Sequence, residues 1–289
     1  MIVSVASGKG GTGKTTVAVN LALTASRREE VHLLDCDVEE PNAYIFIQPE
    51  FSQKKDVKVP VPEIDETACT YCGTCARICE YNALAVVKDS VLVFPELCHG
   101  CGGCRLLCPE QAIRETGRSI GVMESGRRDR LHFTHGRLNI GEAISPPLIR
   151  EVKKNIISGR LNILDAPPGT SCPVIETLRG SDFCILVTEP TPFGLHDLKL
   201  AVETVSLLNI PAGVVLNRSG KDECGVVDFC RSRNLPVMMT IPLDKKIAET
   251  YSRGDILIDV LPGLKQSFMN LYRRLDSMLA GISPREERI

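Results

Sequence analysis

Eight of the thirteen cysteines lie between residues 69 and 108, in two sets with the same internal spacing. Each set reads Cys-x-x-Cys-x-x-Cys-x-x-x-Cys, and the second begins 29 residues after the first. Three thiolates at this spacing can wrap one iron–sulfur cube, whereas the fourth lies too far along the chain and ligates the other cube. The repeat therefore predicts two 4Fe–4S clusters. One would use Cys69, Cys72, Cys75 and Cys108, and the other Cys79, Cys98, Cys101 and Cys104.

The repeat extends beyond the cysteines, because Asn82-Ala83-Leu84 matches Gln111-Ala112-Ile113. Zinc is the alternative ligand, since thiolates at this spacing also bind Zn²⁺. Two copies of a four-cysteine pattern favour instead the clusters of bacterial two-cluster ferredoxins. We therefore expect residues 60–117 to form a small α+β domain like a bacterial ferredoxin. It would be inserted into a larger domain made of residues 1–59 and 118–289.

The stretch from Gly8 to Thr16 has the spacing of a phosphate-binding loop. It fits Gly-x-x-x-x-Gly-Lys-Thr and joins the apolar run of residues 2–6 to an apolar helical stretch. Glycine lets such a loop aim its N–H groups at anionic oxygens, and the helix N-terminus adds positive charge there. Lys14 would reach the β- and γ-phosphates, and the Thr15 hydroxyl would bind Mg²⁺. The predicted nucleotide-binding residues of this loop are Gly8, Lys9, Gly10, Gly11, Thr12, Gly13, Lys14, Thr15 and Thr16.

Carboxylates follow two other apolar strands. Asp35 and Asp37 end the strand that begins at residue 31, and Asp165 ends the strand that begins at residue 161. Ligands of open α/β sheets bind at the carboxyl ends of the strands, where carboxylates can hold Mg²⁺ or orient an attacking water. We expect Asp165 to contact the Mg²⁺ shell, and the Pro-Pro-Gly segment after it to sense the γ-phosphate.

These residues must be positioned by a regular α/β fold. Strands of continuous Val, Ile and Leu that alternate with helices predict a mostly parallel sheet with helices on both faces. We predict further strands at 183–187, 212–216 and 236–241, and helices at 145–158, 194–208, 226–233 and 264–279. Residues 48–67 contain three prolines and lack an apolar pattern, so we expect an extended connector there rather than a core element.

The composition limits the classes of function. The chain has 289 residues, 43% of them hydrophobic, and a net charge of −2, which gives no indication of nucleic-acid or anionic-membrane binding. No apolar run approaches the roughly 18 residues of a membrane span. The sequence passes from Met1 directly into a strand, without a targeting signal. Because unpaired cysteines also suit a reducing compartment, we expect a cytoplasmic protein.

The loop Lys9-Gly-Gly-Thr-Gly-Lys-Thr-Thr resembles the deviant phosphate loop of MinD/Mrp-type ATPases. That family includes the nitrogenase iron protein and the cytosolic iron–sulfur scaffold ATPases. The resemblance covers nearly the whole chain. Its further motifs are Asp35-x-Asp37 with Pro41-Asn42, Asp165-x-Pro-Pro-Gly169, Asn217-Arg218 and Pro242-x-Asp244. The cysteine block is similar to the two-cluster ferredoxin module that some members carry.

The resemblance implies a homodimer, or a heterodimer with a related ATPase, that sandwiches two ATP molecules. Lys9 would cross to the partner's phosphates like an arginine finger, and Asp37 would orient the attacking water. Asp35 and Asp165 would hold the Mg²⁺ shell, with Thr15. On the base side Asn217 would contact adenine, and the remaining implied nucleotide-binding residues are Arg218, Pro242 and Asp244.

Cys172 follows Asp165 at the spacing at which the nitrogenase iron protein carries a switch cysteine. There, that cysteine helps to bind a cluster shared across the dimer. No cysteine lies between Cys108 and Asp165, and Cys224 and Cys230 lack the Cys-x-x-Cys spacing of the scaffold ATPases. Cys172 is therefore a candidate switch thiol, with transient metal binding or simple burial as alternatives.

Three functions suit these residues. In the first, ATP hydrolysis rearranges a dimer and drives electron transfer from the clusters to a redox partner. In the second, the ATPase helps to assemble a metallocluster in a client protein. The alternative is a MinD-like positioning or regulatory ATPase whose clusters are structural or redox-sensing. The absence of a strongly basic helix weakens the third, because such a helix would anchor the chain to a membrane.

Overall fold

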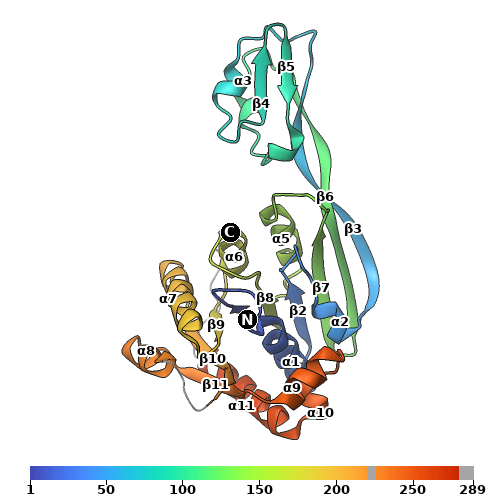
Figure 1. Cartoon of the computed structure of the whole chain (residues 1–289). Helices are drawn as coiled ribbons and strands as arrows, with labels where there is room; N and C mark the ends of the chain where they lie inside the picture. Colours follow the sequence, from blue (N-terminus) through green and yellow to red (C-terminus); the bar gives the residue numbers. More distant parts are fainter. Residues whose placement is uncertain (221–224, 280–289) are drawn as a thin grey trace.

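The computed structural model describes residues 1–220 and 225–279. Its centre is a nine-stranded sheet with the strand order β11-β10-β9-β1-β8-β2-β7-β6-β3 (Figure 1). The strands from β11 to β7 run parallel, and β6 and β3 are antiparallel to their neighbours. The parallel strands are β1 (Ile2–Ala6), β2 (Val31–Asp35), β7 (Leu131–Leu138), β8 (Leu161–Asp165), β9 (Phe183–Thr188), β10 (Ala212–Ser219) and β11 (Val237–Pro242).

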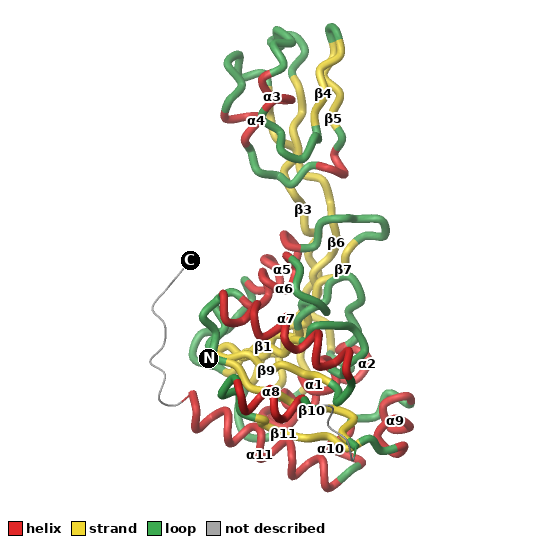
Figure 2. The backbone as a smooth tube through the Cα atoms, turned by 60° about the vertical axis from the view of Figure 1, so that its left-hand side comes forward, coloured by secondary structure: helices red, strands yellow, loops and turns green. Residues whose placement is uncertain are grey.

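Helices cover both faces of this sheet (Figure 2), so the prediction of a mostly parallel α/β sheet is confirmed. Successive residues of one strand enter different cores, as Leu33 packs with α1 on one face and Leu34 with α5 on the other. This explains why the central strands are apolar throughout rather than alternating. The helices of the large domain are α1 (Lys14–Ser26), α2 (Ala43–Ile47), α5 (Pro146–Lys153), α6 (Cys172–Leu178), α7 (Pro192–Leu207), α8 (Val226–Ser232), α9 (Lys245–Ser252), α10 (Leu257–Val260) and α11 (Pro262–Leu279).

The expectation of an irregular connector at residues 48–67 is wrong. Residues Glu50–Ile64 form the long edge strand β3, which pairs with β6 (Ile113–Arg128) as a two-stranded ribbon. Pro60 and Pro62 are tolerated because an edge strand leaves one row of backbone groups without ladder partners. The ribbon continues past both domain boundaries that the sequence suggested, at residues 59/60 and 117/118.

The helix predicted at residues 145–158 ends five residues early, at Lys153. The Asn155 side chain donates to the carbonyl oxygens of Glu151 and Val152, at 3.0 and 3.1 Å. These contacts satisfy carbonyl groups of the last turn and so stop the helix. Residues 119–125 lie within β6, and residues 131–135 lie within β7.

The ribbon carries residues 65–112 at its far end, away from the large domain (Figure 1). We call this segment the insert. Its elements are α3 (Thr74–Arg77), β4 (Leu84–Val87), β5 (Ser90–Val93), the 3₁₀ turn η1 (Pro95–Leu97) and α4 (Gly103–Leu106). β4 and β5 form a separate antiparallel pair. Among the described residues, no helix is both long and apolar enough to cross a membrane.

Candidate functional site

The predicted phosphate loop connects β1 to α1 at the carboxyl edge of the parallel strands. Gly13 has a left-handed backbone with φ 94°, and a side chain there would collide with the Asn217 amide, 2.4 Å from the added Cβ. Gly8 is equally confined, because its added Cβ would lie 2.2 Å from the Asp197 carbonyl oxygen at α7. Lys14 and Thr15 begin α1 and are buried. The loop thus has the tight packing and helix N-terminus that a polyphosphate requires.

A pocket of about 370 Å³ opens beside this loop. One end is polar and includes Lys14, Thr15 and Asp37. The other end is largely apolar, and sequence reasoning missed its residues. They are Ile241, Ile247, Ala248, Tyr251 and Leu257, from β11, α9 and α10. The pocket therefore joins a phosphate-type end to an apolar end suited to a planar base.

Asn20, which sequence reasoning also missed, ties the two ends together. Its side-chain amide donates to the Thr16 carbonyl oxygen at 2.8 Å, and its Oδ1 accepts the Ile258 N–H at 3.2 Å. Asn20 is buried on α1, and its bond with the Ile258 N–H is shielded from water. An amide within the mostly apolar stretch of residues 17–23 is the signal in the sequence that could have identified it.

Three predicted carboxylates meet at the end of β2 and β8. Asp35 and Asp165 occupy paired positions on these neighbouring strands, and both are fully buried. Burial and the nearby Asp165 carboxylate raise the pKa of Asp35 well above its usual range. Asp35 accepts backbone N–H bonds from Asp37, Asn42 and Ala43, at 3.1 to 3.2 Å. Its two oxygens therefore fix the loop after β2 and the start of α2.

Asp165 has a different environment. Neither carboxylate oxygen has a hydrogen-bond partner among the described residues. Burial raises the pKa of Asp165 to about 7, although the nearby Lys14 ammonium and Thr15 hydroxyl oppose the shift. A buried carboxylate without a partner is costly unless a cation satisfies it. Asp165 and Thr15, both oxygen donors, therefore fit the hard Mg²⁺ ion that accompanies a nucleotide.

Asp37 lines the pocket and is half-buried. Burial raises the pKa of its carboxyl to about 6, with the Lys14 ammonium acting in the opposite direction. The residue lies in the loop between β2 and α2, close to the phosphate end. Its carboxylate therefore lies within the electrostatic influence of the Lys14 ammonium at this end of the pocket.

The other predicted residues surround the loop in distinct ways. Asn217 lines the pocket, but its amide donates to the Thr12 carbonyl oxygen at 2.7 Å and so braces the phosphate loop. Arg218 has φ 55°, and its N–H binds the Asn217 Oδ1 at 2.9 Å. Pro242 ends β11, and Asp244 caps α9 by accepting the Lys246 N–H at 2.8 Å. All four residues line the same pocket.

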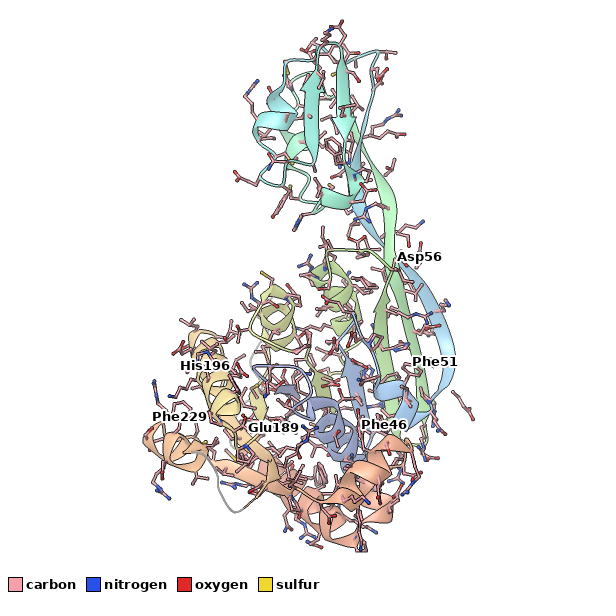
Figure 3. The ribbon with its side chains drawn as sticks, in the orientation of Figure 1. Phe46, Phe51, Asp56, Glu189, His196 and Phe229 are labelled. Atoms are coloured by element: carbon pink, nitrogen blue, oxygen red, sulfur yellow. The ribbon has the colours of Figure 1, made fainter. Side chains whose placement is uncertain are left out.

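Lys9 lies at the outer side of the loop, with its ammonium 3.8 Å from Glu189 Oε2. Glu189 follows β9 and is labelled in Figure 3. Its other oxygen, Oε1, accepts a hydrogen bond from Arg218 Nη1 at 2.5 Å. Sequence reasoning missed Glu189, because no motif of the phosphate loop includes a carboxylate at the end of this strand.

In the insert, the two cysteine sets have the same local structure. Gly73 and Gly102, 29 residues apart, have φ 73° and 74° and precede the short helices α3 and α4. The last cysteine of each set accepts a backbone N–H at 3.3 Å, Cys79 from Ala83 and Cys108 from Ala112. The internal repeat of the sequence is thus a repeat of the fold, and the N–H groups point at sulfur atoms, as in iron–sulfur sites.

A small cavity in the insert is lined by all four cysteines predicted for one cluster, Cys69, Cys72, Cys75 and Cys108. Apolar side chains such as Val86 and Ile113 complete its wall. Across the residues that the structure describes, no three His, Cys, Asp or Glu side chains lie close enough to form a ready metal site. The thiolate donors, the N–H bonds to sulfur and the apolar wall nevertheless fit a cluster, so the cluster assignments stay predictions.

Cys172 is exposed at the first position of α6, the helix that follows the strand ending at Asp165. It therefore lies at the surface after the Pro-Pro-Gly segment, and the alternative of a buried small residue is wrong. Cys230 is buried on α8, while Cys224 lies outside the described residues. The role of Cys172 as a switch thiol stays a prediction.

The sheet, the phosphate loop and the adjoining pocket define a P-loop nucleotide-binding protein of the α/β class. A family model described as the CobQ/CobB/MinD/ParA nucleotide binding domain matches residues 3–258. The chain therefore belongs to the CobQ/CobB/MinD/ParA family of nucleotide-binding ATPases.

Individual relatives agree with this assignment. The uncharacterized protein MJ0579 of Methanocaldococcus jannaschii is 36% identical over 258 residues, which are 88% of this chain and 90% of that protein. An iron-sulfur cluster carrier protein of Aquifex aeolicus is 24% identical, over 96% of this chain and 68% of its own length. Among solved structures, the septum site-determining protein MinD of Pyrococcus horikoshii, complexed with Mg-ADP, superposes with a TM-score of 0.62. It is 20% identical and the match covers 100% of this chain and 99% of that one.

Proposed function

We propose that this chain is a Mg-ATP-hydrolysing iron–sulfur protein in which nucleotide state changes the behaviour of two 4Fe–4S clusters in the insert. The clusters would serve electron transfer to a redox partner, or assembly of a metallocluster in a client protein. The observation that carries the proposal is how the ribbon is attached. Its strand β3 follows α2 directly, and β7 ends where the Leu138 N–H binds the Val38 carbonyl oxygen at 2.9 Å. The Asp37 loop therefore leads into the ribbon through α2, and it directly contacts the end of β7, the strand that follows β6.

At the nucleotide site, Lys14 and the backbone N–H groups of the phosphate loop bind the phosphates. Asp165 and Thr15 hold Mg²⁺, with Asp35 fixing the neighbouring loop. Mg²⁺ neutralises charge that develops on the phosphate oxygens. Asp37 orients the attacking water, and its own backbone N–H is held by Asp35 at 3.1 Å. The apolar end of the pocket takes the base, beside Asn217.

Hydrolysis requires a second copy, or a related ATPase, whose Lys9 reaches the phosphates across the interface. Closure of the two subunits would shift the loop that contains Asp37, and this loop carries α2 and the ribbon. Iron–sulfur function is supported by relatives named iron-sulfur cluster carrier proteins, in Aquifex aeolicus and Methanocaldococcus jannaschii, both 24% identical to this chain. A cytosolic Fe-S cluster assembly factor, CFD1 of Yarrowia lipolytica, is 25% identical.

Metal content tests the cluster assignment. Anaerobically purified protein should contain about eight iron atoms per chain, as two cubane clusters require. Replacing Cys72 and Cys75 together by serine removes two ligands of one predicted cluster and should leave about four. Cys172→Ser is the matched control and should leave the iron content unchanged. Iron and zinc are measured by plasma mass spectrometry, and the clusters by electron paramagnetic resonance after reduction.

Stoichiometric zinc in place of iron would contradict the cluster assignment. ATP turnover can also be compared between the iron-free and the iron-loaded protein. Equal turnover by the two would favour the MinD-like positioning or regulatory role. Loss of iron from the Cys172→Ser variant would show that the exposed thiol contributes to a site of its own.

A further inference from the structure

Lys9, the lysine that makes this phosphate loop resemble the deviant type, forms an ion pair within its own subunit. Lys9 Nζ lies 3.8 Å from Glu189 Oε2, and the lysine side chain is 34% exposed. The Ser7 hydroxyl donates to the Lys9 carbonyl oxygen at 2.7 Å, which fixes the backbone from which this side chain extends. Lys9 is thus directed toward a carboxylate of the same chain rather than left free in solvent.

Glu189 is held firmly in place. Its side chain is 11% exposed, and its backbone lies between the end of β9 and the start of α7. The Glu189 carbonyl oxygen accepts the Thr191 N–H at 2.8 Å. The Thr191 hydroxyl in turn caps α7 by accepting the Gly194 N–H at 2.9 Å. A carboxylate on such a tight turn has little freedom to follow a lysine that moves away.

Glu189 also has a second cation that keeps it paired. Arg218 donates to Oε1 at 2.5 Å while Lys9 faces Oε2. Removing one partner from a poorly exposed ion pair is costly, because the remaining charge is left without compensation. Here Arg218 remains when Lys9 departs, so release of the lysine does not leave Glu189 unpaired.

The same segment reaches the phosphate loop from the other side. Asn217, next to Arg218, donates to the Thr12 carbonyl oxygen at 2.7 Å. A closed ring of contacts therefore runs from the loop through Asn217 and Arg218 to Glu189, and back to the loop at Lys9. A change of the loop on nucleotide binding would be felt at Glu189 through both ends of this ring.

We propose that Glu189 is a positioning residue that holds Lys9 in its own subunit until the phosphates of a second, nucleotide-bound copy compete for it. The inference rests on the proposed function, because it requires a lysine that acts across a dimer interface. The polyphosphate of ATP carries more negative charge than one carboxylate. Transfer of Lys9 from Glu189 to the phosphates of the second copy therefore favours the dimer only when ATP is bound. Glu189 thereby suppresses association of the nucleotide-free protein.

The contact is tested first in the nucleotide-free chain, where no dimer is needed. The rate at which acetic anhydride modifies Lys9 is measured by mass spectrometry, relative to the exposed Lys88. Glu189→Gln should raise the relative rate about threefold to fivefold, as expected for loss of one partly exposed ion pair. Glu203→Gln, which replaces an exposed carboxylate of α7, is the matched control and should leave the relative rate of Lys9 modification unchanged. An unchanged rate in Glu189→Gln would overturn the proposal.

The consequence is tested by sedimentation of the full chain over a range of protein concentrations, with ATP present. Glu189→Gln should form dimers at about threefold to fivefold lower protein concentration than the unmodified chain. The effect should vanish when Lys9→Ala is combined with it, since Glu189 acts through Lys9. Equal dimerisation of the Glu189→Gln variant and the unmodified chain would overturn the proposal, even if acetic anhydride modified Lys9 faster in the variant. An unmodified chain that stays monomeric with ATP would contradict the proposed function itself, and this outcome is recognised without any Glu189 variant.

Discussion

Asp165 and Lys14 illustrate how burial sets the chemistry of single residues in this site. Asp165 is fully buried and has a pKa raised to about 7, and Lys14 is also buried within the same site. The Lys14 ammonium compensates the Asp165 carboxylate only in part, so a cation would stabilise the carboxylate further and a phosphate would stabilise the ammonium. The site therefore has buried charges that the proposed nucleotide and magnesium would compensate.

Replacing Lys14 by alanine should abolish ATP hydrolysis, because it removes the buried cation that the phosphates require. Iron content should be unaffected, since the insert lies at the far end of the ribbon. Turnover is measured by phosphate release and iron by plasma mass spectrometry. Lys265→Ala, at an exposed position of α11, is the control and should hydrolyse ATP normally. Normal hydrolysis by Lys14→Ala would show that the loop is not the active site.

His32 predicts acid sensitivity that does not involve the nucleotide site. It is buried on β2, with Nε2 2.9 Å from the Thr134 hydroxyl. Burial, aided by the charges of His132 and Arg160, lowers the pKa of His32 from 6.5 to about 4. Unfolded protein therefore binds a proton at a higher pH than folded protein. The stability that neutral His32 contributes is complete above pH 6.5 and is lost as the pH falls toward 4.

The loss from this one residue approaches roughly 3 kcal/mol at the acid end. We expect His32→Gln to flatten the decline of the urea midpoint between pH 6.5 and 4.5, measured by circular dichroism on iron-free protein. His196→Gln changes an exposed histidine of α7 (Figure 3) and should leave the decline as it is. Parallel pH profiles for His32→Gln and the unmodified chain would contradict the assignment.

At the scale of elements, the ribbon is the part of the fold that the sequence did not predict. The central strands and most helices were predictable, because strands buried on both faces are continuously apolar. β3 was not predictable, because its first seven residues are all exposed and their sequence does not alternate between apolar and polar residues. Its stability comes from pairing with β6, a contact between segments far apart in the sequence. The apolar end of the pocket was missed for the same reason, because α9 and α10 contribute to it only after folding.

Arg128 joins α2 to the ribbon. Its guanidinium donates to the carbonyl oxygens of Ile47 and Phe46, at 3.1 and 3.5 Å, and so closes the end of this short helix. Phe46 and Phe51, on the two sides of the junction between α2 and β3, are labelled in Figure 3. The contact fixes the helix that follows the Asp37 loop against β6.

We expect Arg128→Ala to lower the free energy of unfolding by about 1 kcal/mol, the usual effect of losing a charge-assisted hydrogen bond at a partly exposed site. Arg127→Ala, the exposed neighbour, should change it by less than about 0.5 kcal/mol. Both are measured from urea midpoints. Equal midpoints for the two variants would indicate that the Arg128 contact does not hold α2.

At the scale of the whole molecule, one long ribbon joins the large domain to the insert (Figure 1). β3 follows α2, and β6 is followed by β7, which ends against the Asp37 loop, so this loop is connected to both strands of the ribbon through α2 and β7. A movement of that loop would be transmitted to the insert as a change in the ribbon's direction. Such a change would alter the exposure of the proposed clusters to solvent and partners, and exposure is one determinant of cluster potential.

The most direct test is an anaerobic redox titration of the intact, iron-loaded protein by electron paramagnetic resonance, with Mg-ATP and without nucleotide. The account predicts that the midpoint of at least one cluster shifts by about 59 mV or more, which is a tenfold change in a one-electron equilibrium. The Lys14→Ala protein should show no shift, because it does not respond to nucleotide. Superimposable titrations of the unmodified protein with and without Mg-ATP would contradict coupling between the ATPase site and the clusters.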